Sequence, residues 1–186
     1  MTTTSQRLVI QALTLGFKGI DTANQRRHYF EEGVGLGIQQ FLKSSQKTRG
    51  DLFIQTKFTS VHGQDNRKPY DEFDSLTNQL KQSFASSLEH LQTDYIDSYI
   101  LHGPALSHGI IDADLEIWQA MEALVLDGKV KVLGISNVNI DHPPAASTNN
   151  PHDIFLMLPQ EQSHIFQQHV YSHRCLPALP LALLLR

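Results

Sequence analysis

The sequence predicts an α/β fold whose strands run parallel to one another. Between residues 6 and 136, short apolar runs alternate with longer segments in which apolar residues recur every three or four positions. The short runs have the length of buried strands, and the longer segments have the period of helices that lie on a sheet. Because strands joined through helices pair in parallel by right-handed crossovers, we expect the strand ends to meet at one edge of the sheet.

The first half of the chain is predicted to form a helix, a strand, a second helix and a second strand at residues 6–15, 17–22, 31–44 and 52–57. The first helix ends at Gly16, which stands where a left-handed C-terminal cap belongs. The second helix places Val34 and Ile38 on one face. Gly50 and Asp51 break this helix before the apolar run of the second strand.

The second half is predicted to continue in the same order, with elements at residues 70–91, 95–102, 114–126 and 130–136. The first of these helices has the most regular period, with apolar residues at Phe73, Leu76, Leu80, Phe84, Leu88 and Leu91. Trp118 and Met121 are expected on the buried face of the next helix, which ends at Asp127-Gly128. Both a (β/α)₈ barrel and an open doubly wound sheet fit this alternation.

Composition narrows the classes of function. The chain has 186 residues, 40 % of them hydrophobic, and a net charge of −4 from 15 basic and 19 acidic side chains. It lacks the broad positive field that nucleic acids require, so no nucleic-acid partner is expected. The single cysteine, Cys175, cannot form an internal disulfide bond, which favours a cytoplasmic protein. The apolar segment at 176–185 contains two prolines and is shorter than the ~20 residues of a membrane span, so no membrane association is expected.

Four residues at or just after predicted strand ends form the strongest candidate site: Asp21, Tyr29, Lys57 and His102. A tyrosine is a weak acid near neutral pH, and a nearby ammonium would favour its ionised form. A carboxylate would hold that ammonium in place, and an imidazole could orient a carbonyl oxygen or relay a proton. Each residue also has an ordinary interpretation: a solvated strand end for Lys57, a loop hydrogen bond for His102 and a turn residue for Asp21.

Four segments, at residues 16–23, 52–57, 87–102 and 128–137, resemble the aldo-keto reductases and occur in the order of that family. The resemblance covers roughly residues 6–139. It implies an NADP(H)-dependent oxidoreductase of barrel fold that transfers a hydride between the nicotinamide and the carbon of a small carbonyl or alcohol substrate. By motif position, Asp21, Lys57 and His102 match three of the four catalytic residues. Ser136 and Asn137 match the pair that binds the nicotinamide carboxamide, and Asp21 and Thr22 are expected beside the cofactor.

The fourth catalytic residue departs from the family pattern. The family commonly has its tyrosine five residues after the aspartate, where this sequence has Arg26. The nearest tyrosine is Tyr29, which stands three residues farther on and just before Glu31 and Glu32. We therefore predict that Tyr29 donates the proton through a longer loop. The alternative is an aromatic side chain that only packs at a helix N-terminus.

Two further patterns have structural interpretations. Residues 33–37 read Gly-Val-Gly-Leu-Gly, but they lie within a helical pattern and lack the spacing of a phosphate-binding loop, which favours close helix packing. The late histidines lack the spacing of a metal site, and no metal is expected; they are His142, His152, His164, His169 and His173.

The predicted elements account for about four of the eight βα units of a barrel. We expect a partial (β/α)₈ barrel at residues 1–139 and a divergent Pro- and His-rich tail at 140–186 that is poorly ordered or loosely helical. Such a sheet would expose strand edges and could self-associate. Two functions follow: NADP(H)-dependent reduction of an aldehyde or ketone to an alcohol with Tyr29 as proton donor, or a truncated, inactive remnant that acts through protein–protein contacts.

Overall fold

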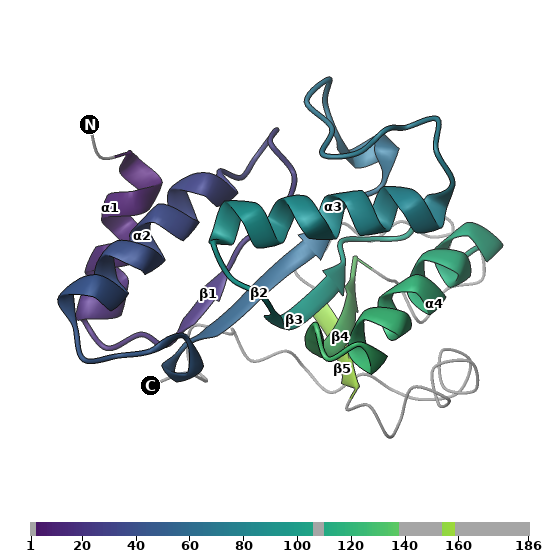
Figure 1. The fold of residues 1–186 in the computed structure, drawn as a ribbon. Helices are drawn as coiled ribbons and strands as arrows, with labels where there is room; N and C mark the ends of the chain where they lie inside the picture. Colours follow the sequence, from purple (N-terminus) through teal and green to yellow (C-terminus); the bar gives the residue numbers. More distant parts are fainter. Residues whose placement is uncertain (1–2, 106–109, 138–153, 159–186) are drawn as a thin grey trace.

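The computed structural model describes residues 3–105, 110–137 and 154–158, which form a single five-stranded sheet with helices packed on it (Figure 1). The strands are β1 (Gly19–Asp21), β2 (Phe53–Phe58), β3 (Ile96–Leu101), β4 (Val130–Ser136) and β5 (Ile154–Leu158). Their spatial order is β1-β2-β3-β4-β5. The first four strands pair in parallel, and β5 pairs antiparallel to β4.

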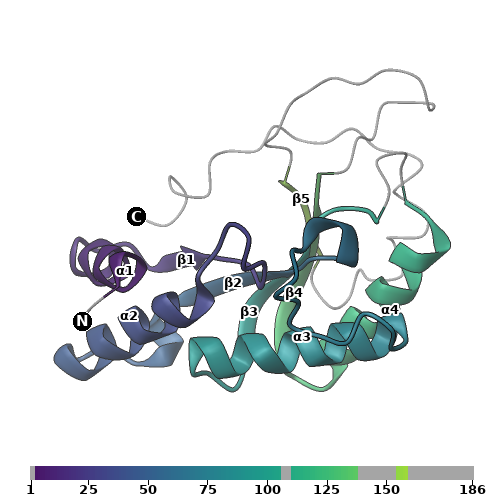
Figure 2. The ribbon, with the colours of Figure 1, turned by 90° about the horizontal axis from the view of Figure 1, so that it is seen from above.

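Four α-helices follow one another around the outside of this sheet: α1 (Thr4–Thr14), α2 (Glu31–Ser44), α3 (Leu76–Leu91) and α4 (Asp112–Leu126). Figure 2 shows α2, α3 and α4 on one face of the curved sheet. The spatial order of β1 to β4 repeats their sequence order without the reversal of a doubly wound sheet. The arrangement is therefore that of a barrel wall.

The core lies between the helices and the two central strands. All six residues of β3 are buried, and in β2 only Phe53 is partly exposed. Tyr99 packs edge-on against Phe84 of α3, with ring centroids 5.1 Å apart. Residues on both faces of β2 and β3 are thus buried. These two strands therefore hold the residues at their carboxyl ends in a fixed arrangement.

The glycines of residues 33–37 pack closely, as predicted. A Cβ atom on Gly35 would lie 2.0 Å from the backbone oxygen of His90 in α3, and one on Gly37 would lie 2.8 Å from Cβ of Val9 in α1. Small residues therefore let α2 approach both neighbouring helices. Gly16 has φ +96°, which confirms its expected left-handed cap.

The structure corrects the predicted start of the third helix. α3 begins at Leu76 because the Ser75 side chain accepts a hydrogen bond from the backbone N–H of Asn78 and caps the helix. Phe73, predicted on its apolar face, is 92 % exposed. Tyr70 is buried instead, and its hydroxyl donates to the backbone oxygen of Thr59 at 2.7 Å. The apolar period alone therefore predicts a helix that begins too early in the sequence.

The other differences between the predicted and the observed elements are small. α4 begins at Asp112, two residues before the predicted start, and the Asp114 carboxylate accepts a hydrogen bond from the backbone N–H of Ile111 at 3.0 Å. The sequence predicts no strand after residue 136, so β5 is an addition. The late histidines and Cys175 lie outside the described residues. Within the part of the chain that the structure describes, no helix has the length and apolar character of a membrane span.

Candidate active site

Asp21 and Lys57 meet at the carboxyl ends of β1 and β2. The Lys57 ammonium lies 2.6 Å and 2.7 Å from the two carboxylate oxygens of Asp21, and it donates to the backbone oxygen of Thr22 at 2.9 Å. The lysine side chain is 4 % exposed, whereas that of Asp21 is 40 % exposed. A buried ammonium with three oxygen acceptors is held rigidly, and the carboxylate faces the open side of the site.

Two buried residues that the sequence analysis did not identify support this pair. Nε2 of Gln55 donates to Oδ1 of Asp21 at 2.7 Å, and the hydroxyl of Ser98 donates to Oε1 of Gln55 at 2.7 Å. The Ser98 bond fixes the Gln55 amide with its nitrogen toward Asp21. The strand period offered a signal, because Gln55 lies two positions before Lys57 and so shares its face of the sheet.

Tyr29 lies in the loop between β1 and α2, next to both Lys57 and His102. Nζ of Lys57 is 5.3 Å from the centroid of the Tyr29 ring. The rings of Tyr29 and His102 meet edge to face, with centroids 5.9 Å apart. Burial, and then the negative charge of Asp21, raise the pKa of Tyr29 above its ordinary value. This direction is opposite to the expected effect of a lysine, because burial, the larger cause, disfavours the charged phenolate.

His102 directly follows β3, and its backbone N–H donates to the oxygen of Phe58 at 2.9 Å. Nδ1 of the imidazole is 2.7 Å from the hydroxyl of Thr59. Burial, and then the charge of Lys57, lower the pKa of His102 to about 4. The imidazole is therefore neutral at neutral pH and can donate from one ring nitrogen while the other pairs with Thr59.

Ser136 and Asn137 lie at the end of β4, next to His102. The Asn137 amide nitrogen donates to the backbone oxygen of His102 at 2.6 Å and is 3.3 Å from the Ser136 hydroxyl. Asn137 has φ +57°, a left-handed conformation that asparagine tolerates better than most residues. No described residue bonds its Oδ1. A carboxamide, which has one acceptor and one donor group, matches this free acceptor beside a hydroxyl.

Arg26, at the usual position of the family tyrosine, points to other partners. Its guanidinium pairs with Glu32 and is 3.4 Å from Nε2 of His90. The loop thus directs Arg26 toward α2 and α3 and brings Tyr29 to Lys57 and His102.

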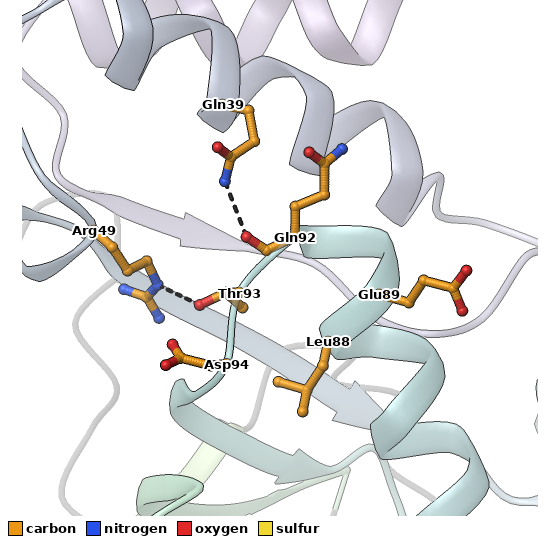
Figure 3. A pocket seen from close by; sticks show the side chains of 7 residues that line it. All are labelled: Gln39, Arg49, Leu88, Glu89, Gln92, Thr93 and Asp94. Atoms are coloured by element: carbon orange, nitrogen blue, oxygen red, sulfur yellow. Dashed lines mark hydrogen bonds between the residues drawn. The ribbon is translucent and has the colours of Figure 1, made fainter.

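A separate hollow of about 580 Å³ lies at the opposite edge of the sheet (Figure 3). It is lined by Gln39, Arg49, Leu88, Glu89, Gln92, Thr93 and Asp94. Arg49, which precedes β2, donates to Thr93 at 2.9 Å and pairs with Asp97 at 2.8 Å. Its cation is thus already paired, and the other charged side chains of the lining are the exposed carboxylates of Glu89 and Asp94. None of the lining residues is a tyrosine, lysine or histidine, so the candidate chemistry remains at the carboxyl ends of the strands.

Comparisons with known proteins identify the family of this chain. A model of the aldo/keto reductase family matches residues 2–177. Glyoxal reductase of Bacillus subtilis is 35 % identical over 131 residues, which are 70 % of this chain and 39 % of that protein. Methylglyoxal reductase of Escherichia coli is 34 % identical over 132 residues, 71 % of this chain and 40 % of that protein. The chain thus spans about two fifths of the length of these curated relatives.

Solved structures agree with the family model. An aldo/keto reductase from Brucella melitensis matches with a TM-score of 0.56 and 32 % identity, over 75 % of this chain and 46 % of that one. An aldo-keto reductase of Bombyx mori, crystallised with NADP, matches with a TM-score of 0.56 and 30 % identity, over 73 % of this chain and 41 % of that one. The parallel sheet is therefore part of a (β/α)₈ barrel, as predicted. The chain belongs to the aldo/keto reductase family.

Proposed function

We propose that this chain carries the catalytic residues of an NADP(H)-dependent reductase that converts a small aldehyde or ketone to an alcohol, with Tyr29 as the proton donor. The observation that supports the proposal most is the contact of one tyrosine ring with both the Lys57 ammonium and the His102 imidazole. A carboxylate, an ammonium and a neutral imidazole around one phenol suit proton transfer to a carbonyl oxygen.

The residues at the end of β4 suit a nicotinamide. The Ser136 hydroxyl and the Oδ1 of Asn137 would bind its carboxamide, and Asp21, the more exposed member of its ion pair, would face the ribose. Thr22 is 1 % exposed and contributes its backbone oxygen, which holds Lys57. The bound nicotinamide would supply the hydride.

The protein's part in the reaction is to orient the carbonyl and to move one proton. The neutral His102, with Nδ1 paired to Thr59, donates from Nε2 to the carbonyl oxygen and fixes its position. As negative charge grows on that oxygen, the Tyr29 hydroxyl transfers its proton to it. A raised pKa keeps Tyr29 protonated at neutral pH, and an alkoxide is basic enough to take the proton. The Lys57 ammonium then stabilises the phenolate.

Short dicarbonyl compounds are the first substrates to test, because the relatives compared above are named glyoxal reductase and methylglyoxal reductase. The full 186-residue chain should oxidise NADPH in the presence of methylglyoxal. Tyr29→Phe should lower kcat at least about 100-fold, the lower end of the range for acid–base catalysis, and leave the Kd for NADPH unchanged. Tyr95→Phe is the matched control, because Tyr95 contacts Arg49 and Lys131 at the opposite edge.

Two outcomes would contradict the proposal. Full turnover by Tyr29→Phe would assign the proton to another group. A chain that is folded by circular dichroism but gives no saturable change in nicotinamide fluorescence would favour the non-catalytic alternative.

A further inference from the structure

A buried carboxylate, that of Glu31, lies behind the site and has no part in the mechanism above. Its side chain is 1 % exposed. Oε1 accepts a hydrogen bond from the Thr56 hydroxyl, and Oε2 accepts one from the Ser87 hydroxyl at 3.2 Å. Nδ1 of His90 lies 3.0 Å from the same Oε2. A carboxylate is costly to bury, so contacts from β2 and α3 make this group a fixed point of the fold.

The position of Glu31 links this fixed point to the candidate site. Glu31 is the first residue of α2, two positions after Tyr29, and Thr56 directly precedes Lys57 in β2. Side chains alternate along a strand, so Thr56 faces the helices while Lys57 faces the site. The bond between Glu31 and Thr56 therefore ties the end of the tyrosine loop to the strand that carries the lysine.

The start of the same loop is anchored separately. The backbone N–H of Asn24 donates to the oxygen of Lys57 at 3.3 Å, and the Gln25 amide donates to Gly63 at 2.6 Å. After Tyr29, Phe30 occupies the N-cap position without a side-chain capping bond. Two residues of chain span at most about 7 Å, so a shift of Glu31 passes directly to Tyr29.

We propose that Glu31 is a positioning residue, which holds Tyr29 beside Lys57 and His102 through its bond to Thr56. The inference rests on the proposed function only in treating Tyr29 as the proton donor. The loop is longer than the family pattern, and a longer loop needs an anchor close to its reacting residue. Loss of the anchor displaces the phenol, and a displacement of about 1 Å lowers kcat about 100-fold while NADPH binding persists.

The test uses the full chain labelled with 3-fluorotyrosine, whose five tyrosines report separately by fluorine NMR. The Tyr29 signal is assigned by its absence in Tyr29→Phe. Thr56→Val removes the hydroxyl at nearly constant volume, and Thr56→Ser retains it. Glu31→Gln removes the charge. Asp97→Asn is the control for a buried carboxylate far from the site, because Asp97 pairs with Arg49 and Lys131 at the opposite edge.

We expect Glu31→Gln and Thr56→Val to move the Tyr29 signal, to leave those of Tyr70 and Tyr99 in place, and to lower kcat about 100-fold at unchanged NADPH affinity. Thr56→Ser should restore the wild-type signal and kcat. Asp97→Asn should lower the melting temperature without moving the Tyr29 signal.

The fluorine signal separates this inference from the proposed function. If the wild-type chain shows no turnover but Thr56→Val still moves only the Tyr29 signal, the proposed reductase function is refuted and the anchoring role of Glu31 is retained. An unmoved Tyr29 signal in Thr56→Val overturns the anchor whatever the activity. If Glu31→Gln does not fold, Thr56→Val alone decides. If Thr56→Val shifts all the tyrosine signals to the positions of an unfolded chain, the anchoring role is also refuted, because the bond between Glu31 and Thr56 then stabilises the whole fold.

Discussion

Replacing Gly35 by alanine tests how closely α2 must approach α3. The added Cβ would lie 2.0 Å from the backbone oxygen of His90 and 2.9 Å from Cα of Leu91. An ordinary contact begins near 3.4 Å, so the helices must separate locally by about 1.4 Å. Backbone atoms of a helix cannot rotate aside as a side chain can. The two helices would therefore lose packing around the buried Ile38 and Leu91.

The expected cost follows from two opposing effects. Overpacking a well-packed interface costs about 1–3 kcal/mol and occasionally more. Alanine has a helix propensity about 1 kcal/mol better than that of glycine, which offsets part of the loss. Because the clash is with backbone on both sides, we expect a net loss of about 2 kcal/mol in the free energy of unfolding. In a chain of this size, such a loss lowers the melting temperature by about 4–8 °C.

Urea unfolding followed by circular dichroism measures this cost directly. Gly50→Ala is the matched control, because its Cβ would lie 3.7 Å from the Thr48 hydroxyl, an ordinary contact. The control should change the free energy of unfolding by less than about 0.5 kcal/mol. A Gly35→Ala protein as stable as the wild type, or more stable, would refute the close approach of the two helices.

Two further predictions concern charged groups. The folded-state pKa of His102 is about 4, below the ordinary value of 6.5, so the unfolded chain binds its proton first as pH falls. Stability present above pH 6.5 is therefore lost between pH 6.5 and 4, by at most about 3 kcal/mol, and His102→Gln should remove this part of the pH dependence. Equal slopes of the free energy of unfolding against pH in the wild type and in His102→Gln would contradict this prediction. Asp97→Ala leaves Arg49 and the backbone N–H of Ile54 without their buried partner and should cost about 3 kcal/mol in urea unfolding. The exposed Asp94→Ala should cost less than about 0.5 kcal/mol, and equal losses would show that the Asp97 contacts contribute nothing.

Elements with a local cause were predictable. α2 and β4 have the predicted bounds, and Gly16 has the predicted left-handed cap. Apolar period and chain-breaking residues act within a few positions, so a sequence reveals them directly. The predicted start of α3 was wrong because the Ser75 cap begins the helix at Leu76, although the apolar period continues upstream to Phe73.

The site was predictable only in part. Strand ends of a parallel sheet must meet, so Asp21, Lys57 and His102 could be grouped from the alternation alone. Whether the longer loop returns Tyr29 to that edge depends on anchors such as Glu31, whose partners are 25 and more positions away. The direction of the Tyr29 pKa shift likewise depends on burial and on the nearby negative charge of Asp21.

The sequence by itself determined the alternation of strands and helices, the glycines that cap or pack a helix, and the set of polar residues at the strand ends. Only the tertiary structure decided which of these groups touch, and it added the Gln55–Ser98 relay and the Glu31 anchor. The physical reason is one of range. Backbone conformation responds to neighbours along the chain, whereas hydrogen bonds, burial and charge depend on distances through space that only the folded chain sets.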